Sequence, residues 1–104
     1  MKDADGKMKI MSFLEYCPED FEKIVEKFRS AMADREKGSK KFPKVAFAPH
    51  SFGGEFKSVQ VYEDPTEEQL NALVIHYMPE GKLKFVPLLD AGKFIEQYYK
   101  EKKK

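Results

Sequence analysis

The chain has 104 residues, 41% of them hydrophobic, so a single domain can bury a core without disulfides. The chain has 19 Lys and Arg residues and 18 Asp and Glu residues, which gives a net charge of +1. This near-balance excludes a general electrostatic attraction to nucleic acid or to anionic membranes. The single cysteine, Cys17, excludes an internal disulfide, and no run approaches the roughly 18 apolar residues of a membrane span.

These limits predict one domain over residues 8–104, in a reducing cytoplasm, with no membrane association. Residues 1–7 are polar and include Gly6, so we expect them to form a flexible leader. No charged and then apolar export signal opens the chain.

The first predicted element is a strand over residues 9–16. Met11 and Phe13 alternate with Ile10, Leu14 and Tyr16, so both faces of this strand are apolar. A strand that is apolar on both faces is typical of the middle of a sheet.

A helix is predicted over residues 18–37. Pro18 suits its first turn, and Gly38 offers a left-handed cap at its end. Apolar residues with helical spacing would form its buried stripe, namely Phe21, Ile24, Val25, Phe28 and Met32.

Two strands, 45–48 and 56–62, then form a hairpin around Gly53-Gly54. The next predicted helix begins with Asp64 as its cap, Pro65 in the first turn and Glu67 reaching back. Its buried stripe would contain Leu70, Leu73, Val74, Tyr77 and Met78. We assign His76, which lies off this stripe, to solvent or to capping of the last carbonyls.

The last strand is predicted over residues 83–89. Pro87 is poorly suited to an inner strand, so we expect this strand at an edge of the sheet. Asp90 then caps a final helix whose apolar residues are Phe94, Ile95, Tyr98 and Tyr99.

This order predicts an α+β domain of ferredoxin-like β-α-β-β-α-β topology with an added C-terminal helix. Right-handed crossovers place the first two helices on one face of a four-stranded antiparallel sheet. The other face would be uncovered and apolar, and such a surface needs a cover. A second copy of the sheet, a nucleic acid or the C-terminal helix of the same chain would each serve.

The segments AFAPHSFGGEFKSVQVYEDPTEEQL and LKFVPLLDAGKFIE resemble an uncharacterised family of the dimeric α+β barrel superfamily. The resemblance implies a homodimer in which two sheets face each other around a cavity. It implies no single reaction, since the superfamily includes cofactor-free oxygenases, isomerases, haem-degrading enzymes and ligand-binding regulatory modules. Haem has no further support, because the chain has only two histidines and no tryptophan.

His50 occupies the position that the family motif gives to its histidine, just before the Gly53-Gly54 turn. There it could face a cleft as an acid, a base or a hydrogen-bond donor. A solvated turn histidine is the plainer interpretation.

Five further residues alternate along the first and third strands, and we expect them to share the uncovered face and to bind a small, partly apolar ligand. They are Ser12, Tyr16, Ser58, Gln60 and Tyr62. Aromatic walls with a few polar groups are typical of a small-molecule site. The alternative is a plain dimer interface whose polar groups bond to one another.

Other sites find little support in the sequence. Two separated histidines and one cysteine have no metal-ligand spacing, and Gly53-Gly54 lacks a phosphate-binding pattern, so we expect no metal and no cofactor. Cys17 stands before a helix, where it is either a reactive thiolate or a small buried residue. The RNA-recognition motif fails, because Lys57 and Val59 stand where it needs aromatics.

We therefore expect a homodimeric α+β barrel that binds a small ligand between its sheets or serves as an assembly module. A cofactor-free oxygenase or isomerase-like enzyme using His50 is one alternative. A sheet that binds RNA or protein is the other.

Overall fold

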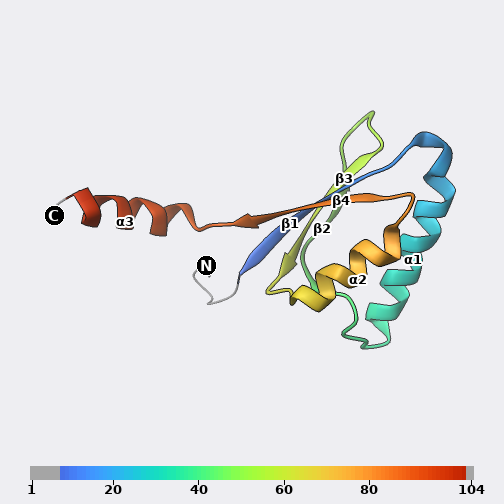
Figure 1. Cartoon of the computed structure of the whole chain (residues 1–104), viewed down its shortest axis with the longest axis horizontal. Coiled ribbons are helices and arrows are strands. Elements are labelled where there is room, and N and C mark those ends of the chain that lie inside the picture. Colours follow the sequence, from blue (N-terminus) through green and yellow to red (C-terminus); the bar gives the residue numbers. More distant parts are fainter. Residues whose placement is uncertain (1–7, 103–104) are drawn as a thin grey trace.

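The structure, a computed structural model, describes residues 8–102, so the expected leader lies outside the described residues. Its elements follow one another in the predicted order (Figure 1). They are β1 (Lys9–Glu15), a 3-10 turn (Pro18–Asp20), α1 (Phe21–Glu36), β2 (Lys44–Ser51), β3 (Lys57–Glu63), α2 (Glu67–Tyr77), β4 (Lys82–Leu88) and α3 (Ala91–Lys102).

The four strands form one antiparallel sheet in the order β2-β3-β1-β4. β1 pairs with β3 on one side and with β4 on the other, which explains why both of its faces are apolar. β4 is an edge strand, as the position of Pro87 predicted. The α+β class and the ferredoxin-like topology with an added C-terminal helix are thus confirmed.

α1 and α2 cover one face of this sheet (Figure 1). The core lies between them and the strands, and its buried side chains are Ile24, Ala31, Phe42, Tyr62, Leu73 and Tyr77. The predicted stripes are wider than the real contact, because Phe21, Met32, Val74 and Met78 are exposed. Ala31 and Leu73, each 1% exposed, mark where the two helices approach the core most closely.

The start of α2 differs from the prediction. Thr66, not Asp64, is its cap: the Gln69 backbone N–H donates to Thr66 Oγ1 at 3.1 Å, and the Thr66 N–H donates to Gln69 Oε1 at 3.0 Å. Asp64 has a positive φ of 45°, whereas a cap residue needs an extended backbone. The helix therefore begins two residues later than Pro65 suggested.

The prediction for His76 was also wrong. Its Nε2 lies 2.7 Å from the carbonyl oxygen of Lys27, and its ring packs against Phe42 and Tyr77. His76 thus ties α2 to the middle of α1 instead of facing solvent. The periodicity of α2 alone gave no sign that α1 would cross it at this point.

Candidate functional site

The five predicted ligand-binding residues share one face of the sheet, but it is the face that α1 and α2 cover. In the β1–β3 register Ser12 is opposite Gln60, and Leu14 is opposite Ser58. Ser12 and Tyr62 are each only 3% exposed, and Tyr62 is part of the core. Their expected location on the uncovered face is therefore wrong, because the side of the strand that bears Leu14 and Tyr16 is the one that meets the helices.

Tyr62 lies at the centre of a small polar group inside this core. Its hydroxyl donates to Gln60 Oε1 at 2.9 Å, and the Arg35 guanidinium stands 5.6 Å from its ring centre. Burial raises the pKa of Tyr62, although the charge of Arg35 and its hydrogen bond oppose this shift. The role of Arg35, which also donates to the Pro43 carbonyl oxygen at 3.0 Å, was not visible in the sequence.

A groove between α1 and the β2–β3 half of the sheet brings three of the predicted residues near one another. Tyr16 and Ser58 line one cavity of about 230 Å³, and Gln60 lines a second of about 270 Å³. Phe28 and Pro49 line both cavities, so the two adjoin. The walls are mostly apolar, and Arg35 stands in the second cavity.

His50 lies within β2, not in the turn, because this strand extends to Ser51. Two register shifts along β2 place His50 opposite Val59 and Phe47 opposite Val61. The His50 ring stacks on Phe47 with 4.6 Å between ring centres, and its Nδ1 lies 2.7 Å from the Ala48 carbonyl oxygen. His50 also borders the cavity that contains Tyr16 and Ser58.

We call the face of the sheet opposite α1 and α2 the open face. Residues directly opposite each other on antiparallel strands share a face, so the register defines its rows. The first row is Phe47, Val61, Met11 and Val86, and the second is Val59, Phe13 and Lys84, with His50 paired to Val59 after the β2 register shift and bordering the α1-side cavity as well. An apolar centre thus crosses all four strands.

Charged residues border this apolar centre at both ends of the strands. One end carries Lys9, Lys44 and Glu63, and the other carries Glu15, Lys57 and Lys82. At the second end a shallow cavity of about 200 Å³ is lined by Phe13 and by Lys57, Lys82 and Lys84, among others. The lysines outnumber the glutamates, so the open face is positively charged.

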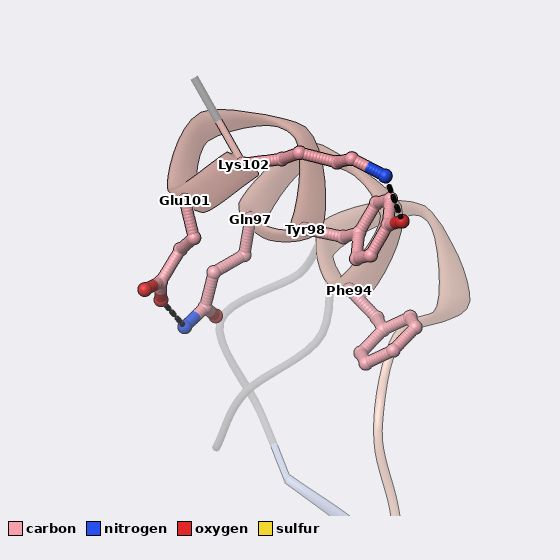
Figure 2. Close-up of a pocket in the computed structure, with 5 residues that line it drawn as sticks. All are labelled: Phe94, Gln97, Tyr98, Glu101 and Lys102. Carbon is pink, nitrogen blue, oxygen red and sulfur yellow. Dashed lines mark hydrogen bonds between the residues drawn. The ribbon is translucent and has the colours of Figure 1, made fainter. Parts of the chain in front are cut away.

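α3 differs from the other helices because none of its residues is buried. It projects from the end of β4, away from the sheet and from α1 and α2 (Figure 1). Its apolar stripe is open: Phe94 is 67% exposed, Ile95 53%, Tyr98 48% and Tyr99 58%. Figure 2 shows Phe94, Gln97, Tyr98, Glu101 and Lys102 around one hollow on α3, where Gln97 Nε2 donates to Glu101 Oε2 at 3.0 Å.

The structure also bears on the remaining candidates. Within residues 8–102 no three His, Cys, Asp or Glu side chains lie where they could hold a metal ion together. Cys17 is exposed, so its burial as a small apolar residue is not observed. None of the helices in the described part of the chain has the length and apolar character needed to cross a membrane.

Comparison of the chain with protein-family models, curated proteins and solved structures finds no match. The similarity to dimeric α+β barrel proteins therefore depends on the quoted motifs and on the element order alone. The fold leaves two apolar surfaces partly exposed, the open face and the stripe of α3.

Proposed function

We propose that this domain is a homodimer-forming module whose open face is covered by a second copy of the chain. The observation that supports this most strongly is the apolar row Phe47, Val61, Met11 and Val86, which runs across every strand of the sheet. In this row Phe47 is 46% exposed and Met11 and Val86 are half-buried, whereas Val61 is only 7% exposed. Contiguous apolar surface of this kind marks an interaction site in soluble proteins.

The rim of the open face supports the same proposal. An interface typically has an apolar centre and a polar, solvated edge. Here charged residues lie at both ends of the strands, where Lys44 Nζ and Glu63 Oε2 stand 4.0 Å apart. The resemblance to dimeric α+β barrel proteins also implies pairing through this face.

The test is the mass of the chain in solution, measured by light scattering coupled to size exclusion or by sedimentation. We expect the unaltered chain to have the mass of two copies. Phe13→Glu should weaken association by roughly 100-fold or more, since an unpaired charge buried in an interface costs several kcal/mol. Ile75→Glu is the matched control, because Ile75 is 68% exposed on α2, outside the open face.

Two results would contradict the proposal. One is a single-copy mass for the unaltered chain across the micromolar range. The other is a dimer that Phe13→Glu leaves intact, because the second copy would then bind elsewhere on the molecule.

A second candidate function is the binding of a small, partly apolar molecule in the groove between α1 and β2. The observation that favours it is the adjacency of the two cavities, which join Tyr16 and Ser58 to Gln60 through shared apolar walls. Few polar groups on apolar walls are the usual character of such a site.

Native mass spectrometry of protein purified from its own cells tests this second function. We expect a retained molecule that Ser58→Leu displaces by filling the groove, while Ser30→Leu on the exposed side of α1 leaves it bound. If the unaltered protein retains nothing, and if aromatic and aliphatic carboxylates do not shift the amide signals of Tyr16 and Ser58, the groove has no such role.

A further inference from the structure

We propose that α3 is an exchanged arm: in the homodimer, α3 of each copy lies on the open face of the other copy, along β1 and β4. This inference rests on the proposed dimer and names the part of the second copy that covers this half of the face. Two apolar surfaces are left without a cover by residues 8–102: the open face and the α3 stripe of Phe94, Ile95, Tyr98 and Tyr99.

α3 needs a partner to be stable. It has 12 residues, and an isolated helix of that length is marginal in water, where tertiary packing supplies most helical stability. Its start is nevertheless well defined, because the Lys93 N–H donates to Asp90 Oδ1 at 2.9 Å and the Phe94 N–H donates to the Asp90 carbonyl oxygen at 3.1 Å. The helix therefore has a defined start and an exposed apolar stripe, which packing against another surface would bury.

The position of α3 favours a second copy over its own sheet. Only Leu89 and Asp90 separate β4 from α3, and the helix leads away from the sheet (Figure 1). The radius of gyration is 16.3 Å, against about 13 Å for a compact chain of 100 residues. A short hinge that holds an element away from its own domain favours exchange between copies.

The area that a stable dimer buries is larger than the open face alone can supply. Strand spacing and rise give the open face a projected area of roughly 450 Å². A standard interface buries about 800 Å² on each partner, so the sheet alone falls short. The exchange covers the β1–β4 half of the face, roughly 225 Å². An aromatic side chain buries about 150–250 Å², so Phe94, Tyr98 and Tyr99 of α3 bring the area buried on each partner close to the standard size.

A two-fold axis perpendicular to the strands produces the exchange without a change in either copy. Because α3 continues beyond the Leu88 end of β4, the partner's helix then runs over the open face from that end towards Lys82. The helix has about the same thickness, 10 Å, as the spacing between packed layers, so it fits as a second layer.

Charge does not favour this direction. The last turn of α3 carries Lys100 and Lys102, and it comes to the end of the open face that carries Lys57, Lys82 and Lys84. The exchange is therefore carried by burial of the apolar stripe on the β1–β4 half of the face.

The first experiment compares neighbouring positions on α3 in the full chain. Tyr98→Asp places a charge in the stripe, and we expect the dimer dissociation constant to rise by roughly 30-fold or more. Gln97→Asp adds the same charge at the neighbouring position, which is not part of the apolar stripe (Figure 2), and we expect less than a roughly threefold change. Equal effects of the two variants would overturn the exchange.

The second experiment locates α3 directly. Chains with Cys17→Ser and Lys102→Cys carry a nitroxide and are mixed with ¹⁵N-labelled chains that carry none, so any broadening is between copies. We expect the amide signals of Glu15, Lys82 and Lys84 to broaden. If they broaden only when nitroxide and ¹⁵N are in one chain, α3 folds onto its own sheet and the exchange is wrong.

The outcomes separate this inference from the proposed dimer. Suppose that Phe13→Glu dissociates the dimer, but that no broadening between copies is seen and Tyr98→Asp does not weaken association. The proposed dimer then stands and the exchange of α3 is wrong. A single-copy mass for the unaltered chain removes both.

Discussion

The two faces of the sheet are made by alternate residues of the same strands, yet they meet different surroundings. On the side of α1 and α2, Ile10 is 8% exposed and Ser12 3%, and the buried Tyr62 hydroxyl has a partner in Gln60. On the open face, Met11 and Phe13 remain half-buried and Phe47 is 46% exposed. Helices of the same chain cover the first face, whereas no element within residues 8–102 covers the second, where Val61 alone is buried, at 7% exposed.

Apolar character alone therefore does not tell which face of a strand the helices of the same domain will cover. The covered face carries the polar residues Ser12, Ser58 and Gln60, and the open face carries Met11, Val59 and Val61. Buried polar groups are tolerated when they are hydrogen-bonded, and Gln60 and Tyr62 meet that condition. The covered face should therefore determine the stability of the single chain, and the open face its association.

The largest effect is expected at Leu73, which is 1% exposed in the core. Leu73→Ala should lower the free energy of unfolding by about 2–5 kcal/mol, because the lost contacts leave a cavity. Ile75→Ala, two residues away and 68% exposed, should change it by less than about 0.5 kcal/mol. Urea denaturation measures both, and similar losses would mean that α2 does not pack as described.

Gly81 provides the next test of the covered face. A Cβ added there would lie 2.9 Å from Leu14 Cδ1 and 3.0 Å from Tyr77 Cβ. Gly81→Ala should therefore lower the free energy of unfolding by about 1–3 kcal/mol through overpacking. Gly53→Ala is the control, since a Cβ at Gly53 has no atom within 4 Å. A neutral Gly81→Ala would show that the core adjusts easily at this point.

Much of the fold followed from local sequence signals, and the site did so only in part. The alternation in β1, the edge position of Pro87 and the Asp90 cap were all predicted, because each depends on near neighbours in sequence. The side on which Ser12 and Tyr62 lie was not, since both faces of β1 are apolar and the choice depends on how α1 and α2 cross the sheet. The bulges that place His50 beside Phe47 left no signal in the sequence either.

Alkaline pH should affect the covered face through its buried tyrosines. Burial raises the pKa of Tyr77 well above its usual value, so the folded chain keeps a proton that the unfolded chain loses near pH 10. The contribution of Tyr77 to the free energy of unfolding is fully present below about pH 10. It is lost as the pH rises towards the folded-state pKa, by at most about 1.4 kcal/mol per pH unit.

Tyr77→Phe should reduce this slope, measured by urea denaturation between pH 8 and about 11. Tyr98→Phe, at an exposed position on α3, should leave the slope unchanged. If Tyr77→Phe retains the full slope, the loss of stability at high pH comes from other groups, and Tyr77 is not as well shielded as its 5% exposure indicates.

The smallest effect on the single chain is expected at Met11, although it is the direct neighbour of Ile10. In dilute solution Met11→Ala should change the free energy of unfolding by less than about 1 kcal/mol, because its side chain lies on the open face and is only half-buried. At concentrations where two copies associate, the loss of stability caused by Met11→Ala should be larger. Association stabilises the folded chain by mass action, and the variant would lose part of that stabilisation. Ile10→Ala, on the covered face, should cost about 2 kcal/mol or more at both concentrations. If the loss for Met11→Ala is independent of concentration, the open face contributes nothing to association, and both the dimer and the exchanged helix lose their basis.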